Sequence, residues 1–204
     1  AVGSAAALCR GLRAMGKEAW VWKNPQTSQR LSVYLTGLEA EAVPDQATIV
    51  SVDMATENLL PMNGAEFIGK TVLSIDHHMS NEGYAAMTNV QPACAACGEL
   101  LLDILSQLGP VDQTMAEALY LAISTDTGCF QYSNVTGNTL RAAAALKDLG
   151  ADTFPINKVM FGTKTIARLR LESALTDSIE FYAGGKVGLC VMTNAMLDAI
   201  GASA

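Results

Sequence analysis

The stretch that decides the fold is Thr71-Val72-Leu73-Ser74-Ile75-Asp76-His77-His78. Its first five residues are mostly apolar and partly β-branched, which is typical of a buried strand. Asp76, His77 and His78 follow at once, and these two histidines are the only ones in the chain. Polar side chains at the end of a core strand are unfavourable unless something there needs them. The Asp-His-His triplet is therefore the main indication of function.

Composition sets the broad class of the protein. The chain has 204 residues, of which 50% are hydrophobic and 16% charged, enough for one α/β domain and part of another. A net charge of −7 argues against binding to long nucleic acid, which needs a basic face. No apolar run reaches the roughly 18 residues of a membrane span. Five cysteines, an odd number in mostly apolar surroundings, favour reduced thiols in the cytoplasm over a disulfide framework.

Strands and helices alternate in the first half of the chain. A helix is expected over residues 3–15, and further strands over 19–22, 48–52 and 86–90. This order predicts an α/β fold with a doubly wound, mostly parallel sheet and flanking helices. Ligands of such sheets bind beyond the carboxyl ends of the strands, where Asp53 and Asp76 emerge.

The second half is expected to be more helical. The predicted helices cover residues 93–108, 113–124, 139–149 and 165–178, with Asp112 and Thr136 as N-caps and Gly109 and Gly150 as stops. From residue 181 the pattern changes to a hairpin around Gly184-Gly185. We therefore expect a catalytic domain over 1–162, an interdomain helix or linker over 163–180, and the opening hairpin of a second α/β domain over 181–204.

Three aspartates recur where elements end. Asp53 and Asp76 each end a predicted strand, and Asp126 lies just past a predicted helix. Carboxylates can bridge two cations, and a neutral imidazole suits Mn²⁺, Fe²⁺ or Zn²⁺. Two such ions about 3.5–4 Å apart can clamp a phosphoryl oxygen and generate hydroxide for in-line attack. His77 is then a candidate ligand, the adjacent His78 could contact a phosphate oxygen, and Asp76 could orient an imidazole.

Simpler explanations compete with some of these assignments. A strand-end or helix-end aspartate commonly caps a turn or helix, which is favoured for Asp126 taken alone and stays open for Asp53. Gly3-Ser4 at a helix start could donate backbone N–H groups to an anion, and spacing alone leaves this open. Cys94-Ala95-Ala96-Cys97 has redox spacing, but core packing is favoured because no second pair exists.

Taken together, five segments resemble the DHH phosphoesterase superfamily, which is named for the triplet. The chain is most similar to the branch that degrades very short oligoribonucleotides and dephosphorylates 3′-phosphoadenosine 5′-phosphate. The resemblance runs through nearly the whole chain. Its segments are Val2-Gly3-Ser4, Val52-Asp53, Ile75-Asp76-His77-His78-Met79-Ser80-Asn81, Glu99, and Ser124-Thr125-Asp126-Thr127-Gly128-Cys129-Phe130-Gln131-Tyr132-Ser133.

This resemblance implies roles for individual residues. Asp53 would bridge two Mn²⁺ ions, with Mg²⁺ or Co²⁺ as alternatives, and His77 and Asp126 would bind the second ion. His78, supported by Asp76, would face the substrate phosphate as the catalytic pair. The remaining implied substrate-binding residues are Asn81, Gly3 and Ser4.

The resemblance also implies that the chain is part of a longer protein. The family's first motif carries a histidine and two aspartates, and Ala1-Val2-Gly3-Ser4 matches only its tail. The first strand and most ligands of the first metal would precede residue 1, and the rest of the substrate-binding domain would follow residue 204. The 204-residue chain alone is therefore expected to be inactive or impaired.

The implied activity is metal-dependent hydrolysis of short oligoribonucleotides, 3′-phosphoadenosine 5′-phosphate or both, by attack of metal-bound hydroxide. The alternatives are a cyclic-dinucleotide (c-di-AMP) phosphodiesterase and a catalytically inactive nucleotide-binding module. An inorganic pyrophosphatase fits the segment around Asp126 less well. The partner would be a short oligoribonucleotide or nucleotide, without long nucleic acid or membrane, and a homodimer is compatible with the sequence.

Overall fold

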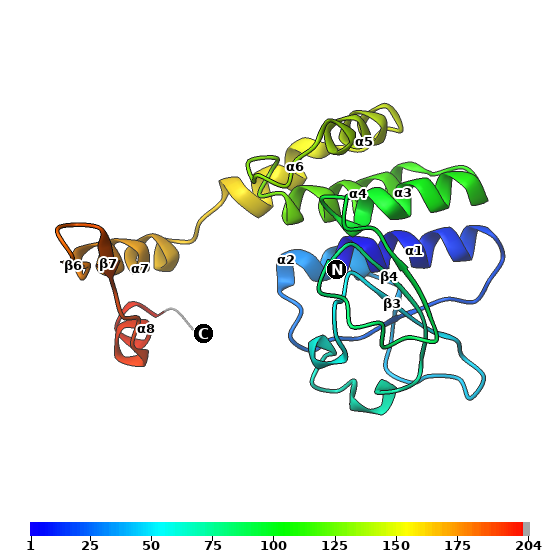
Figure 1. Cartoon of the computed structure of the whole chain (residues 1–204), viewed down its shortest axis with the longest axis horizontal. Coiled ribbons are helices and arrows are strands. Elements are labelled where there is room, and N and C mark those ends of the chain that lie inside the picture. Colours follow the sequence, from blue (N-terminus) through cyan, green and yellow to red (C-terminus); the bar gives the residue numbers. More distant parts are fainter. Residues whose placement is uncertain (202–204) are drawn as a thin grey trace. The chain divides into compact units, whose positions relative to one another are not determined.

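A computed structural model describes residues 1–201 of the protein. It divides into two compact units, the first over Ala1–Phe161 and the second from Gly162 onward (Figure 1). The fold class expected from the sequence, α/β with parallel sheets flanked by helices, is confirmed. Among residues 1–201, no helix has the length and apolarity needed to cross a membrane.

A parallel sheet of three strands positions the polar residues of the first unit. Its order is β3 (Ile49–Val52), β4 (Thr71–Asp76) and β5 (Met87–Val90), and both pairings are parallel. The predicted strands over 48–52 and 86–90 are thus confirmed to within one residue. Because parallel strands end at the same edge, Asp53 and Asp76 emerge side by side.

Four helices complete the core of this unit. They are α1 (Val2–Ala14), α3 (Cys97–Leu108), α4 (Gln113–Asp126) and α5 (Gly137–Asp148). Helix α1 packs on both α3 and α4, and α3 contacts β4 (Figure 1). The predicted caps are confirmed, since the side chains of Asp112 and Thr136 accept backbone N–H groups of α4 and α5. The largest fully buried apolar side chains are those of Leu101, Leu119, Leu121, Ile123 and Leu146.

Helix α3 starts later than the sequence predicts. A helix was expected from residue 93, but α3 begins at Cys97, because the Cys94 N–H donates to the Gln91 carbonyl in a turn (3.0 Å). The carboxylate of Glu99 reaches back to accept the Ala95 N–H (3.0 Å). This turn directs the Cys94 carbonyl toward the end of β4.

The strand expected over residues 19–22 differs from the prediction. Only Val21–Trp22 (β1) is extended, and it pairs in parallel with Glu39–Ala40 (β2) in a separate two-stranded sheet. The Trp22 ring packs edge-on against Phe67, with ring centroids 4.9 Å apart. The remaining short helical elements of this region are α2 (Gln29–Ser32), η1 (Val33–Leu35), η2 (Glu57–Leu59) and η3 (Ala65–Phe67).

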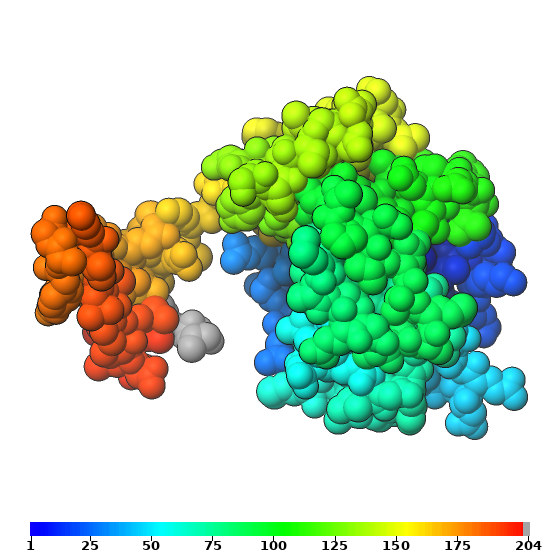
Figure 2. All heavy atoms as spheres, viewed as in Figure 1, coloured from blue at the N-terminus to red at the C-terminus, as the bar shows by residue number. Residues whose placement is uncertain are grey.

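Helix α6 (Thr153–Asn157) and a π-helical turn over Lys158–Gly162 come at the end of the first unit. The second unit then consists of α7 (Ile166–Asp177), β6 (Glu180–Tyr182), β7 (Val187–Leu189) and α8 (Asn194–Ile200). Strands β6 and β7 form the antiparallel hairpin expected around Gly184-Gly185. The hairpin, orange in Figure 2, exposes apolar side chains such as Phe181 and Val187.

Candidate metal centre

Asp53 occupies an unusual backbone conformation at the end of β3. Its N–H donates to the Ile75 carbonyl (2.9 Å), which extends the β3–β4 ladder by one residue. Its φ of 58° lies in the left-handed region, where residues other than glycine are uncommon and where strain often accompanies function. The side chain is only 5% exposed. Its carboxylate is therefore held in a defined direction beside the end of β4.

The imidazole of His77 lies between two carboxylates. Its Nε2 is 3.3 Å from Oδ1 of Asp53 and 3.7 Å from Oδ2 of Asp126. On the other side of the ring, Nδ1 is 3.2 Å from the Cys94 carbonyl oxygen. A carbonyl oxygen only accepts, so Nδ1 carries a proton and Nε2 of the neutral ring presents its lone pair to the carboxylates. That orientation is the one a metal-binding imidazole needs.

Asp126 is the last residue of α4, which runs two residues beyond the helix end predicted at residue 124. After Thr127, the residues Gly128, Cys129 and Phe130 all have positive φ values, so the chain turns back sharply. The Asn134 side chain donates to the Asp126 backbone carbonyl (3.4 Å) across this turn. Burial, together with repulsion from Asp53, raises the pKa of Asp126 to about 6.

Two carboxylate oxygens at this place have no hydrogen-bond partner within residues 1–201. Oδ1 of Asp53 and Oδ2 of Asp126 are both buried and unpartnered, while Oδ2 of Asp53 contacts the Ala1 amino group at 2.5 Å. Unpartnered buried carboxylate oxygens are unfavourable. Two such oxygens facing the Nε2 of His77 form a donor set that suits a divalent cation. The side chains of Asp53, His77 and Asp126 therefore fit a metal ion.

The pKa values of Asp53 and His77 move in opposite directions. Burial by itself raises the pKa of Asp53, but the favourable contacts of its carboxylate, first of all with the adjacent His77 imidazole, outweigh it and lower the value below the ordinary range. Burial likewise lowers the pKa of His77, and the neighbouring Asp53 carboxylate outweighs this and raises it. The centre thus attracts a positive charge, whether a proton or a cation.

The Asp76 carboxylate contacts both histidines. It is fully buried, and its Oδ1 accepts the His77 backbone N–H (2.8 Å) and lies 2.7 Å from Nδ1 of His78. Its Oδ2 accepts from the Asn81 side-chain amide (2.8 Å). Burial raises the pKa of Asp76, but these hydrogen bonds outweigh it and lower the value. One ligand atom each from Asp53, Asp76, His77 and His78 lies within 4.8 Å of the others, yet both oxygens of Asp76 are already engaged.

His78 is placed differently from His77. Its side chain is 42% exposed, and the two rings lie 4.3 Å apart at an angle of 51°. Because Nδ1 faces Asp76, Nε2 on the far side of the ring is available to a ligand. The two neighbouring rings are therefore oriented differently, and the separate roles of His77 and His78 stay a prediction.

Of the remaining predicted substrate-binding residues, Asn81 is hydrogen-bonded within the protein, Gly3 is packed against α4, and the Ser4 hydroxyl is buried with no hydrogen-bond partner among residues 1–201. The Asn81 amide donates to Asp76 and to the Met54 carbonyl (3.3 Å), and its oxygen accepts the Gly83 N–H (2.9 Å). A Cβ added at Gly3 would meet the Ala118 carbonyl of α4 at 2.3 Å, and Ser4 is fully buried. These positions favour supporting and packing roles over the direct substrate contacts expected from the sequence.

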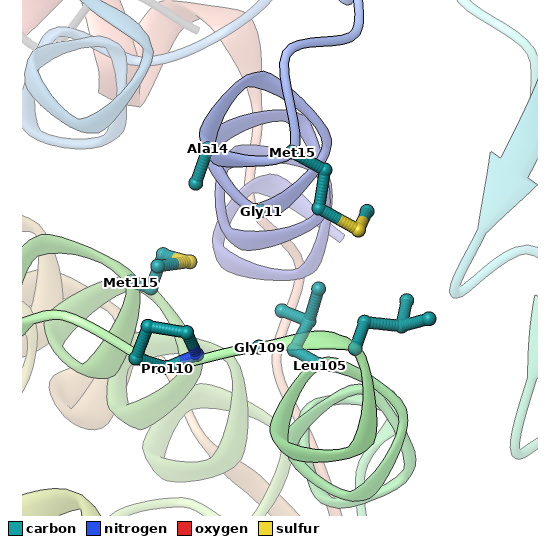
Figure 3. Close-up of a pocket in the computed structure, with 8 residues that line it drawn as sticks. Gly11, Ala14, Met15, Leu105, Gly109, Pro110 and Met115 are labelled. Atoms are coloured by element: carbon teal, nitrogen blue, oxygen red, sulfur yellow. The ribbon is translucent and has the colours of Figure 1, made fainter.

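Two contributors to the centre were not predicted. They are the backbone carbonyl of Cys94, which fixes the His77 ring, and the hydroxyl of Tyr84, which donates to the Met54 carbonyl at 2.9 Å. A backbone carbonyl leaves no signal in the sequence, and Tyr84 lies in a loop without periodicity. The apolar cavity of about 150 Å³ near Gly11, Leu105 and Met115 is at the other end of α1 and holds no titratable side chain (Figure 3).

Comparison with known proteins decides the family. The model of the DHH family, N-terminal domain, matches residues 1–123, more than half of the chain. The chain belongs to the DHH family. This confirms the resemblance inferred from the sequence segments around Asp53 and Asp76-His77-His78.

One relative and one solved structure match most of the length of this DHH-family chain. It is 31% identical over 193 residues to the bifunctional oligoribonuclease and PAP phosphatase NrnA of Thermus thermophilus, covering 91% of this chain and 57% of the relative. The crystal structure of an exopolyphosphatase-related protein from Bacteroides fragilis has a TM-score of 0.85 at 19% identity. That match covers 98% of this chain and 64% of the other, and it shows the fold. The chain thus spans less than two thirds of both proteins.

Proposed function

We propose that this chain carries part of the catalytic centre of a metal-dependent phosphoesterase acting on short oligoribonucleotides, 3′-phosphoadenosine 5′-phosphate or both. The observation that carries the proposal is the placement of His77 Nε2 beside two buried carboxylate oxygens without hydrogen-bond partners. The name of the Thermus thermophilus relative supports the substrate class. Five free cysteines support a reducing compartment such as the cytoplasm.

Asp53, His77 and Asp126 would hold the cation. Two carboxylate oxygens and one imidazole nitrogen favour Mn²⁺, with Mg²⁺ or Co²⁺ as alternatives. Such an ion, when bound, neutralises charge on phosphoryl oxygens and lowers the pKa of water. Asp53 would be the bridging ligand of this set, because its second oxygen faces the start of α1 and could bind a second metal ion there.

The other residues would orient these groups and bind the substrate. The Cys94 carbonyl holds the His77 ring in the tautomer with a free Nε2. Asp76 aligns the His77 backbone and the His78 ring at the same time. When its ring carries protons on both nitrogens, His78 would keep Nδ1–H on Asp76 and donate from the outward Nε2 to a phosphate oxygen, stabilising the charge that develops there.

A hydrolysis assay with three substrates tests the proposal. The protein, with any natural sequence that flanks residues 1–204, is incubated with Mn²⁺ and a linear dinucleotide, a cyclic dinucleotide or 3′-phosphoadenosine 5′-phosphate. We expect turnover of the linear dinucleotide or of 3′-phosphoadenosine 5′-phosphate, its loss on chelation, and its loss in His77→Ala. The exposed Asp103→Asn variant is the control and should keep full activity.

Two other outcomes would replace the proposal. Preferred cleavage of the cyclic dinucleotide would make the protein a cyclic-dinucleotide phosphodiesterase. Nucleotide binding without turnover of any substrate would make it an inactive nucleotide-binding module.

A further inference from the structure

The hydroxyl of Tyr84 lies where β3, β4 and the segment after Asp53 meet. It is 2.7 Å from Oγ of Ser51 on β3, 3.3 Å from Oγ of Ser74 on β4, and 2.9 Å from the Met54 carbonyl oxygen. Ser51 and Ser74 are register partners in the parallel ladder, so their side chains lie on the same face of the sheet. The tyrosine hydroxyl therefore connects β3 and β4 to the residue that follows Asp53.

The hydrogen bonds use the full capacity of this hydroxyl. A phenol has one proton and can accept two hydrogen bonds. Since the Met54 carbonyl only accepts, the Tyr84 proton goes to Met54, and the hydroxyls of Ser51 and Ser74 donate to Tyr84. A phenylalanine would fill the same space but would lose all three contacts.

The Met54 carbonyl is held from a second direction as well. The side-chain amide of Asn81, which also binds Asp76, donates to it at 3.3 Å. One residue further, the Ala55 carbonyl accepts the Glu82 N–H (3.0 Å). The loop containing Asn81 and Tyr84 thus fixes both residues that follow Asp53.

These hydrogen bonds keep the Asp53 backbone from changing to an extended conformation. With φ at 58°, Asp53 is in a conformation that a residue with a side chain keeps only when its surroundings enforce it. On the amino side, the Asp53 N–H is fixed to Ile75, and on the carboxyl side Met54 is fixed to Tyr84. If Met54 were released, Asp53 could return toward an extended backbone, and its carboxylate would turn away from His77.

We propose that Tyr84 is a positioning residue for Asp53. Its hydroxyl holds the Met54 carbonyl, and through it the left-handed backbone that directs the Asp53 carboxylate at Nε2 of His77. The effect on the Asp53 backbone needs no metal, whereas the effect on metal affinity rests on the function proposed above.

The test compares two variants that each remove one tyrosine hydroxyl. Tyr84→Phe removes the contacts described here. Tyr120→Phe is the matched control, since its hydroxyl accepts from the Asn157 amide at 2.9 Å, a contact that involves neither Asp53 nor Met54. For each protein, the ¹³Cα and ¹³Cβ chemical shifts of Asp53 are measured without metal, and the Kd for Mn²⁺ by titration calorimetry.

We expect the Asp53 shifts to move toward extended-backbone values in Tyr84→Phe and to stay at wild-type values in Tyr120→Phe. The Kd for Mn²⁺ should rise about tenfold in Tyr84→Phe only, as is usual when a group that orients a ligand is lost. If Tyr84→Phe proves too unstable for spectroscopy, Ser51→Ala should move the same Asp53 signals in the same direction by less.

The outcomes separate this inference from the proposed function. Unchanged Asp53 shifts in Tyr84→Phe or, in its place, Ser51→Ala would overturn the positioning role, whatever the metal affinity. Shifted Asp53 signals in a protein that binds no Mn²⁺ even as wild type would uphold the positioning role and refute the metal site.

Discussion

The carbonyl oxygen of Cys94 lies 3.2 Å from Nδ1 of His77, although 17 residues separate the two in sequence. This contact decides which nitrogen of His77 carries the proton, because a carbonyl oxygen cannot donate. Nε2 is left with its lone pair beside Asp53 and Asp126. The turn before α3 therefore sets the orientation and tautomer of the His77 ring that a bound cation would require.

Replacing each histidine separately distinguishes their roles. His77→Ala should raise the Kd for Mn²⁺ about 100-fold or more and lower turnover at least as far, because a metal ligand is lost. His78→Ala should lower turnover by about 100-fold, as loss of a charge-stabilising donor does, with a much smaller change in the Kd. Titration calorimetry and steady-state kinetics measure the two effects. Equal loss of Mn²⁺ affinity in both variants would contradict the division of roles.

Asp126→Asn should stabilise the metal-free protein. Burial and repulsion from Asp53 both raise the pKa of the Asp126 carboxylate, and one of its oxygens has no hydrogen-bond partner among residues 1–201. Removing this charge should increase the free energy of unfolding by about 1–2 kcal/mol at neutral pH. Mn²⁺, which should raise the Tm of the wild type, should then raise it little.

Urea unfolding measures the free energy of unfolding, and thermal unfolding with and without Mn²⁺ measures the Tm. Asp103→Asn, an exposed position on α3, serves as the control and should change stability by less than about 0.5 kcal/mol. A destabilised Asp126→Asn protein that still gains stability from Mn²⁺ would show that Asp126 is a structural cap, the simpler explanation of its position.

Much of the fold could be predicted because the apolar residues of its main helices and strands follow clear sequence patterns. The runs that became β3 and β4 are short and apolar between polar boundaries, and α4 and α5 carry visible N-caps at Asp112 and Thr136. The two-residue strand β2 could not be predicted, since its extended backbone comes from pairing with β1 and not from its own sequence.

The site was predictable only in part, because some of its residues are placed by tertiary packing and not by local sequence patterns. Asp53 and Asp76 had to emerge at one sheet edge because their strands are parallel neighbours. The position of Asp126 beside His77 depends on how α4 packs, and only the family resemblance placed these two residues at one metal ion. The left-handed backbone of Asp53 follows from contacts with Ile75 and with the loop that carries Tyr84, which no local pattern encodes.

The cysteines should differ sharply in reactivity. Cys9 and Cys97 are buried, and burial raises the pKa of both thiols, whereas Cys190 is exposed in the second unit. A thiol reagent should therefore modify Cys190 in the native protein, and Cys9 and Cys97 only after unfolding. Mass spectrometry of timed samples identifies the modified residues. Rapid native modification of Cys97 would instead support a redox role for the Cys94–Cys97 spacing.

Gly3→Ala should damage the helix packing on which the centre is built. A Cβ at Gly3 would lie 2.3 Å from the Ala118 carbonyl oxygen and 2.7 Å from the Ala122 nitrogen, both in the backbone of α4. Helices α1 and α4 would have to separate, at a cost of about 1–3 kcal/mol in the free energy of unfolding. Because the start of α1 contacts Asp53, Mn²⁺ affinity should fall as well.

Gly137→Ala provides the matched control for this prediction. Gly137 also lies in the first turn of a helix, but its Cβ would approach only the flexible end of Arg141, at 3.4 Å. There alanine should be neutral or should stabilise the protein by up to about 1 kcal/mol, since glycine is a poor helix former. Chemical denaturation of both variants gives the comparison. Equal stability of the two would mean that the close approach of α1 and α4 does not depend on a glycine at position 3.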